Sequence, residues 1–191
     1  MKNNLQLIAS LLLLQTRRVR DPAVKKALGG MLERVNAVAT VHRRLFQSED
    51  VAMFDLAAFA HDLADDALGA ADRGDVKISL DAQAVQVPAA LAAPLALVIN
   101  ELLLNAIAHG FPPGRGGLIK LGVTHSRRGV RIEVTDNGVG MAVEPSSGPE
   151  SVGLGLTIVD LLAQQLRAEV TRSDAGPGVS TVLELPVDGV S

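Results

Sequence analysis

The chain has 191 residues, of which 48% are apolar and 20% are charged, a profile typical of a folded globular protein with one medium domain and a smaller element. Its formal charge of −3, with four Phe and no Trp or Tyr, excludes a global attraction to nucleic acid or anionic lipid and argues against base stacking. Without cysteine, disulfides and thiolate chemistry are excluded, and a cytoplasmic location is favoured.

The first segment is rich in leucine, yet it is expected to be neither a signal peptide nor a membrane span. Gln6 and Ser10 interrupt the apolar run, and three arginines follow it without a cleavage pattern. The uninterrupted stretch Leu11–Leu14 is far shorter than the roughly 20 residues that a bilayer requires. We therefore expect a soluble chain with no membrane segment of its own.

Residues 1–48 are predicted to form a helical hairpin that serves as a dimerisation region. Leu5, Ile8 and Leu12 step by three and four, and Asp21-Pro22 supplies the start of a second helix. That second helix repeats its apolar residues by sevens over 28–45. A hairpin with two apolar stripes cannot bury both of them alone, so we expect two chains to form a four-helix bundle as a homodimer.

Residues 49–191 are predicted to form one α+β domain. Two alternating segments, 118–124 and 130–135, should be antiparallel neighbours joined through a turn at 126–129. A loop rich in Gly, Pro and Ser spans 142–152. The other expected elements are helices at about 55–68, 95–109 and 154–166 and strands at about 76–80, 85–87, 169–172 and 181–185.

The first motif with candidate chemistry lies on the long apolar helix. Glu101 and Asn105 are four residues apart and project from one face, with His109 one turn further on. Polar side chains within an apolar helix cost free energy unless something hydrogen-bonds or coordinates them. An Asn carbonyl suits Mg²⁺, and a Glu can orient or deprotonate a nucleophile. A helix whose polar side meets solvent is the alternative.

The second motif, Asp136-Asn137-Gly138-Val139-Gly140, directly follows the strand 130–135. An Asp at a strand end can accept a hydrogen bond from an exocyclic amine such as that of adenine, and the glycines let the backbone pass close to a flat base. A type I′ turn explains the same residues.

The third motif, Gly153-Leu154-Gly155-Leu156, joins the loop to a helix, where outward backbone N–H groups make an anion site. The alternative is an ordinary glycine-rich loop. The chain contains neither a Gly-Lys-Ser/Thr P-loop nor a complete G-x-G-x-x-G.

Together and in this order, the three motifs resemble the N, G1 and G2 boxes of the GHKL ATPase superfamily. The resemblance implies a GHKL-type α/β sandwich that binds ATP and Mg²⁺ beneath a mobile lid, here 142–152. It implies Asn105 as the metal ligand, Glu101 as the catalytic carboxylate and Asp136 as the adenine reader. The other nucleotide-binding residues would be His109, Gly138, Gly140, Gly153, Leu154 and Gly155.

The N-terminal hairpin narrows the resemblance. Lys2-Asn3-Asn4-Leu5-Gln6, Val41–Phe46, and Asn100–Asn105 followed by Phe111–Gly117 are similar to the HisKA-2 and HWE group of bacterial sensor histidine kinases. That group implies transfer of the ATP γ-phosphoryl to a histidine and relay to a response regulator. The alternative is a non-catalytic, ATP-responsive dimeric scaffold or an anti-sigma-like switch.

Three departures from the group's pattern bear on function. Ala108 stands where the group has a basic residue, and Gly178-Val179 replaces Gly-Thr, which leaves Ser180 or Thr181 to supply a hydroxyl beside adenine. Lys2 aligns with the Lys of the group's His-Arg-Val-Lys-Asn-Asn motif, so the phosphoacceptor His would fall just before Met1. The chain as it stands is therefore expected not to phosphorylate itself, through truncation or as a natural acceptor-less relative.

None of the four histidines is an obvious substitute for that acceptor. His42 lies on an apolar line of the second helix and is expected to pack in the hairpin, and His61 is expected at the surface. His125 falls near a hairpin turn. His109 is the one we expect near the nucleotide phosphates.

Overall fold

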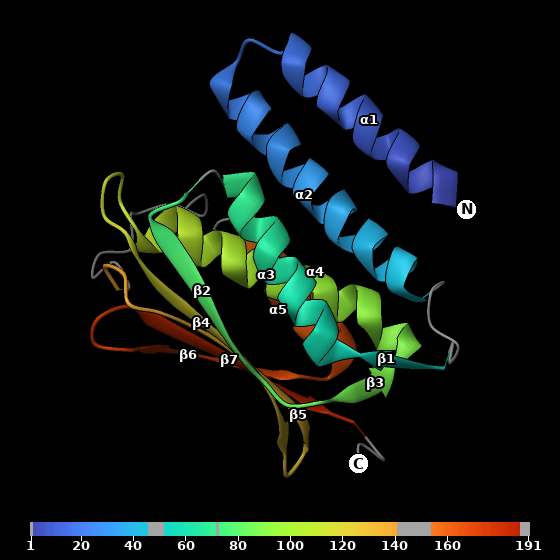
Figure 1. The fold of residues 1–191 in the computed structure, drawn as a ribbon, viewed down its shortest axis with the longest axis vertical. Helices are drawn as coiled ribbons and strands as arrows, with labels where there is room; N and C mark the ends of the chain where they lie inside the picture. Colours follow the sequence, from blue (N-terminus) through green and yellow to red (C-terminus); the bar gives the residue numbers. More distant parts are fainter. Residues whose placement is uncertain (1, 46–51, 72, 141–153, 188–191) are drawn as a thin grey trace.

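The structure, a computed structural model, describes residues 2–45, 52–71, 73–140 and 154–187. It has three layers (Figure 1): a helical hairpin lies on one side of a layer of helices, and a five-stranded sheet lies on the other. This arrangement confirms the predicted α+β class with its N-terminal hairpin. The expected domain boundary at residue 48 and the loop 142–152 lie outside the described residues.

The hairpin consists of α1 (Lys2–Arg18) and α2 (Pro22–Leu45). The predicted start of α2 is confirmed, because the backbone N–H of Ala23 donates to Asp21 Oδ1 at 2.8 Å. Ala37 and Val41 of α2 are buried against the rest of the chain. α1 packs on α2 and leaves several of its large apolar side chains exposed, namely Leu7, Ile8, Leu11, Leu13 and Leu14.

The surface on which α2 docks holds two carboxylates that repel each other. Glu33 of α2 is half-buried, and burial, together with the negative charge of Asp66 on α3 (Leu56–Ala71), raises the pKa of Glu33 above 4.5. The folded-state pKa exceeds the unfolded one, so the stabilising contribution is fully present below pH 4.5 and is lost as the pH rises through the folded pKa.

We expect Glu33→Gln to raise the Tm of the chain at neutral pH, because glutamine keeps the shape of the side chain and removes the buried charge. The gain should shrink as the pH falls through the raised pKa of Glu33 and be lost below pH 4.5. Thermal unfolding followed by circular dichroism over a pH series measures it. Asp65→Asn, which removes an exposed charge on α3, is the matched control, and equal gains for both variants would contradict the prediction.

The sheet has the strand order β2-β4-β5-β7-β6. Only β2 and β4 are parallel, and the predicted antiparallel hairpin is confirmed, with Val123 opposite Ile132. One face carries buried apolar side chains against the helices, whereas the other is polar. The strands are β2 (Val76–Ala82), β4 (Gly117–Ser126), β5 (Gly129–Asp136), β6 (Glu169–Asp174) and β7 (Val179–Pro186). A separate pair consists of β1 (Met53–Asp55) and β3 (Gln86–Pro88). The strand β1 was not predicted, because three residues are too few to show a periodic pattern.

The central helix α4 (Ala89–Asn105) begins six residues before the predicted start at Leu95. The prediction missed these first six residues, Ala-Ala-Leu-Ala-Ala-Pro, which hold only one large apolar side chain; Pro94 lies inside the helix. The helix continues as a π-helical turn, η1 (Ala106–Gly110). Residues 89–110 are long and apolar enough to cross a membrane, but most of this stretch is buried as a core helix packed against α2, α3 and α5 (Leu154–Leu166).

Candidate nucleotide site

Asp136 ends β5 on the helix-covered face of the sheet and is 6% exposed. Its Oδ1 accepts a hydrogen bond from the backbone N–H of Gly138 at 2.8 Å, and the N–H of Val139 donates to the carbonyl of Gly110 at 2.9 Å. A hairpin turn is the wrong explanation for this motif, because β5 pairs with β4 before it and with β7 far along the chain. The turn instead holds the strand end against η1.

Close backbone approaches around Asp136 require glycine at two positions. A Cβ at Gly178, where φ is +100°, would overlap the carbonyl oxygen of Asp136, and a Cβ at Gly138 would overlap the carbonyl oxygen of Gly110. Even at Gly110 a Cβ would lie 3.1 Å from Asp136 Oδ1. Segments from η1, from the loop after β5 and from the start of β7 therefore meet at this carboxylate.

The two hydroxyls considered for the adenine side lie on opposite faces of β7. Thr181 is 7% exposed and lies opposite Val134 on the helix-covered face, as Asp136 does. The Ser180 hydroxyl donates to Glu133 Oε1 at 3.2 Å on the open face. Of the two, Thr181 is therefore the one that shares the face of Asp136.

Glu101 and Asn105 lie on the side of α4 that faces the start of α5. Glu101 is 3% exposed, so the solvent-facing alternative is wrong for this residue. A Cβ on Gly155 would lie 2.6 Å from Glu101 Oε2 and 3.3 Å from Asn105 Nδ2, which brings the first and third motifs together. Asn105 Nδ2 has no hydrogen-bond partner among the described residues, and a buried unpaired donor of this kind fits a polar ligand such as a phosphate oxygen.

The helix links the two clusters. With a rise of about 1.5 Å per residue, Glu101 and Gly110 lie about 13 Å apart along α4 and η1. The carboxylate of Asp136 thus lies near one end of this stretch, and the Glu101–Asn105–Gly155 cluster lies at the other. A long polar ligand with a base at one end and anionic groups at the other fits this layout.

The remaining predicted site residues are placed unevenly. His109 is exposed on η1 beside Gly110, and Gly140, with φ +84°, lies close to Gly178. Leu154 begins α5, and Gly153 lies outside the described residues. No cluster of three or more His, Asp or Glu side chains suited to a metal occurs in the described ranges.

The spacing of residues gave no indication of Arg34, a residue of α2. Its Nε donates to Glu101 Oε1 at 2.7 Å and its Nη2 donates to Glu101 Oε2 at 3.0 Å. The two residues are 67 positions apart, and no local pattern links them. The hairpin therefore contacts the candidate site directly.

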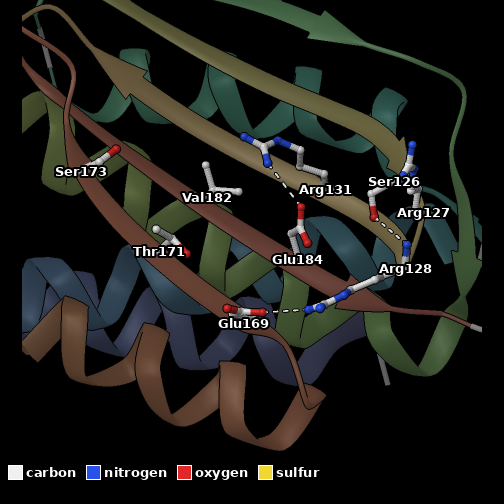
Figure 2. Close-up of a pocket in the computed structure, with 9 residues that line it drawn as sticks. All are labelled: Ser126, Arg127, Arg128, Arg131, Glu169, Thr171, Ser173, Val182 and Glu184. Atoms are coloured by element: carbon white, nitrogen blue, oxygen red, sulfur yellow. Dashed lines mark hydrogen bonds and ion pairs between the residues drawn. The ribbon is translucent and has the colours of Figure 1, made fainter.

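The open face of the sheet carries a shallow depression of about 630 Å³ (Figure 2), lined by residues of β5, β6, β7 and the β4–β5 turn. Four of its charged side chains form two ion pairs: Arg131 with Glu184 at 3.3 Å and Arg128 with Glu169 at 2.9 Å. Because Arg131 precedes the buried Ile132 on β5, this depression lies across the sheet from Asp136.

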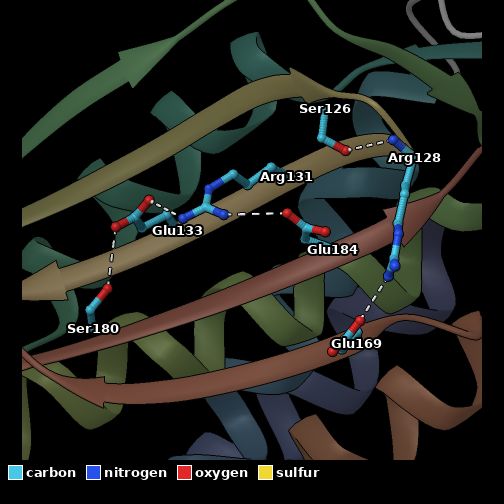
Figure 3. A network of polar contacts seen from close by, with 7 residues as sticks. All are labelled: Ser126, Arg128, Arg131, Glu133, Glu169, Ser180 and Glu184. Carbon is cyan, nitrogen blue, oxygen red and sulfur yellow. Dashed lines mark hydrogen bonds and ion pairs between the residues drawn. The ribbon is translucent and has the colours of Figure 1, made fainter.

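A polar network occupies the same face (Figure 3). Partial burial alone would raise the pKa of Glu133, but hydrogen bonding to Arg131 and to the hydroxyls of Ser180 and Thr135 holds that pKa below its ordinary value. The mutual pairing explains why this polar face is stable in contact with solvent, and it leaves the helix-covered face as the candidate site.

Comparison with known proteins gives two family matches that together cover most of the chain. Residues 1–71 match the family described as "Histidine kinase", and residues 90–189 match "Histidine kinase-, DNA gyrase B-, and HSP90-like ATPase". The second match covers the strands and helices that surround Asp136, Glu101 and Gly155.

Individual proteins agree with these matches. The sensor histidine kinase PdtaS of Mycobacterium tuberculosis is 32% identical over 191 residues, which cover 97% of this chain and 38% of PdtaS. Blue-light-activated histidine kinase 2 of Erythrobacter litoralis is 28% identical over 97% of this chain and 54% of its own length. The histidine kinase domain of the E. litoralis EL346 kinase has the same fold, with a TM-score of 0.73 and 23% identity over 96% of this chain and 94% of that domain. The chain thus spans well under two thirds of the curated relatives it matches.

Proposed function

The chain belongs to the histidine kinases with an HSP90-like ATPase domain, and we propose that it is the catalytic core that transfers the γ-phosphoryl group of ATP to a histidine, for relay to the receiver domain of a response regulator in the cytoplasm. The observation that carries the proposal is the meeting of Glu101, Asn105 and Gly155 at one end of the stretch 101–110, with the buried Asp136 near its other end.

Each residue of the site has a distinct role in this proposal. Asp136 accepts a hydrogen bond from the adenine amine, and Thr181 supplies a hydroxyl on the same face. Gly155, at the start of α5, provides backbone N–H groups for the phosphates, together with Gly153 and Leu154 of the same motif, and His109 contributes from η1. Glu101 orients the histidine nucleophile.

The amide of Asn105 would hold Mg²⁺ through its carbonyl oxygen and donate to a phosphate oxygen through Nδ2. The unpaired Nδ2 and the close approach of Gly155 fit this assignment. The metal ion supplies charge neutralisation at the phosphates. The protein's part is to fix the position of the phosphates between α4 and α5.

Asn105→Ala is expected to remove most of the Mg²⁺-dependent part of ATP affinity and to spare much of the adenine contact. Isothermal titration calorimetry with ATP in the presence and absence of Mg²⁺ measures both. Asn137→Ala, on an exposed side chain that accepts from the backbone of Leu118, is the control for removal of an amide. No ATP binding by the unsubstituted chain would refute the proposed function.

We also propose that the hairpin mediates a homodimer. Leu7, Leu11 and Leu14 of α1 follow helical spacing and are 62%, 53% and 53% exposed, as an apolar face awaiting a partner helix would be. Leu11→Glu is expected to shift the chain to monomers, because it places a charge within that face. Light scattering coupled to gel filtration tests this, with Leu161→Glu on the exposed side of α5 as the control. A monomeric unsubstituted chain at micromolar concentration would count against the bundle.

A third part of the proposal concerns the histidine that accepts the phosphoryl group. The group's acceptor histidine has no counterpart within residues 1–191 in the alignment of Lys2 with its motif, so we propose that this polypeptide binds ATP without labelling itself.

A further inference from the structure

The contact between α2 and α4 contains one buried ion pair, and that pair includes the proposed catalytic carboxylate. The side chain of Arg34 is 21% exposed and that of Glu101 is 4% exposed. The guanidinium makes two parallel hydrogen bonds of 2.7 and 3.0 Å, one to each carboxylate oxygen. Two-point contacts of this kind fix direction as well as distance.

This geometry leaves little room for a nucleophile at Glu101. A group that orients a nucleophile must lie within about 3 Å of it, whereas Glu101 is covered by Arg34 on the hairpin side and approached by Gly155 on the α5 side. An acceptor histidine can reach the carboxylate only after the guanidinium has moved. Since Arg34 is carried by α2, that movement involves the hairpin.

A second pair of charges between α2 and its docking surface disfavours the docked position that the Arg34–Glu101 ion pair stabilises. Glu33, the residue next to Arg34, is half-buried facing the negative charge of Asp66. Removing one partner from a buried ion pair is strongly unfavourable, so the Arg34–Glu101 contact holds α2 in place while its neighbour weakens the docking. The Arg34–Glu101 attraction therefore favours the docked position of the hairpin, and the Glu33–Asp66 repulsion favours a shift away from it.

We propose that Arg34 is a positioning residue that controls access to Glu101: in the docked state it holds α2 on α4 and shields the carboxylate, and phosphoryl transfer requires the hairpin to shift and the ion pair to break. The proposal rests on the proposed function for the role of Glu101. The docking itself can be tested without nucleotide.

Because the chain has no cysteine, a pair of spin labels can be placed cleanly, at Asn36→Cys on the exposed side of α2 and at Ser79→Cys on the open face of β2. We expect one narrow label-to-label distance in the labelled parent, a broad distribution with Arg34→Gln, and an intermediate one with Arg34→Lys, which keeps the charge but not the two-point contact. Arg43→Gln, which removes another α2 arginine whose recorded contact is with Thr40, should match the parent. A narrow distribution in Arg34→Gln would overturn the proposal.

The variant Arg34→Gln also leaves the buried Glu101 carboxylate without its partner. A double variant separates this unpaired charge from the loss of attraction between α2 and α4. Arg34→Gln with Glu101→Gln removes both charges, and at position 101 it also keeps the shape of the side chain. A broad distribution in the double variant supports a loss of attraction between the helices. A narrow one would mean that Arg34→Gln acts only through the stranded charge, and it would overturn the proposal.

A kinetic measurement connects docking to transfer. In a chain extended by His-Arg-Val in place of Met1, Arg34→Gln is expected to raise kcat for self-labelling severalfold with the KM for ATP nearly unchanged. Arg34→Lys should return kcat toward the parent value. A fall in kcat would overturn the proposal. If the extended parent shows no labelling, the proposed function fails, and the label distances still decide the role of Arg34 in docking.

Discussion

Asp136→Ala is expected to weaken ATP binding by roughly ten- to a hundredfold, because a hydrogen bond to a charged acceptor contributes about 1.5–3 kcal/mol. The carboxylate is 6% exposed and its Oδ1 already accepts from Gly138, so the acceptor is held in place before a base arrives. A preorganised acceptor loses little entropy on binding. The loss of affinity should therefore approach the full value of the hydrogen bond.

Loss of the turn must be separated from loss of the base contact. Asp174→Ala is the matched control: Asp174 Oδ1 also accepts from a backbone N–H two residues on, that of Gly176 at 2.8 Å, but Asp174 is exposed. It should leave ATP affinity within about twofold of the parent, because the Asp174 side chain is exposed, even though Gly178 of the same turn approaches Asp136. Melting curves of both variants show whether the fold survives.

The choice of base gives an independent test. GTP presents a carbonyl oxygen where ATP presents an amine, and a carboxylate cannot donate a hydrogen bond to it. We expect the parent to prefer ATP strongly and Asp136→Ala to lose most of that preference. Equal calorimetric affinities of the parent for ATP and GTP would defeat the assignment of Asp136.

The elements that sequence predicted well are those with long, regular patterns. The alternation in 118–124 and 130–135 predicted an antiparallel pair of strands, and Asp21-Pro22 marked the start of α2, as the structure confirms. The start of α4 was missed because its first six residues are mostly alanine and show little of the large apolar pattern on which the prediction rested.

The parts of the site that escaped prediction depend on tertiary contacts. Asp136 and Glu101 carry recognisable local motifs, but the approach of Gly178 to Asp136 and the ion pair of Arg34 with Glu101 join segments 42 and 67 positions apart. No periodicity or spacing encodes such a pairing, because it arises from how the hairpin and β7 pack on the domain. The face of the sheet on which Thr181 lies could likewise be determined only from the register of β7 against β5.

The largest expected effect concerns phosphorylation: the 191-residue polypeptide should bind ATP and stay unlabelled, whereas the same chain extended by His-Arg-Val in place of Met1 should acquire an acid-labile label. Transfer requires a nucleophile in line with the γ-phosphate, and a well-formed ATP site cannot replace one that is absent. The extension preserves Lys2 and the described helix α1. The two polypeptides therefore differ only at the added His-Arg-Val and at Met1, and changing the added histidine to glutamine isolates the acceptor.

The environments of the four histidines within the chain bear on whether the unextended polypeptide could be labelled. His61 is exposed and pairs with Asp65 at 3.3 Å, and Nε2 of His125 contacts the carbonyl of Ala84 at 3.1 Å at the far end of β4. His42 is half-buried on α2, and His109 is exposed on η1 beside the candidate site. Label on the unextended polypeptide would contradict the assignment and direct attention to His109 and His42, and the loss of that label in His109→Gln or His42→Gln would identify the acceptor. If only the extended chain is labelled, and changing its added histidine to glutamine abolishes the label, the added histidine is the acceptor. This result supports the proposed role of Glu101 in orienting it.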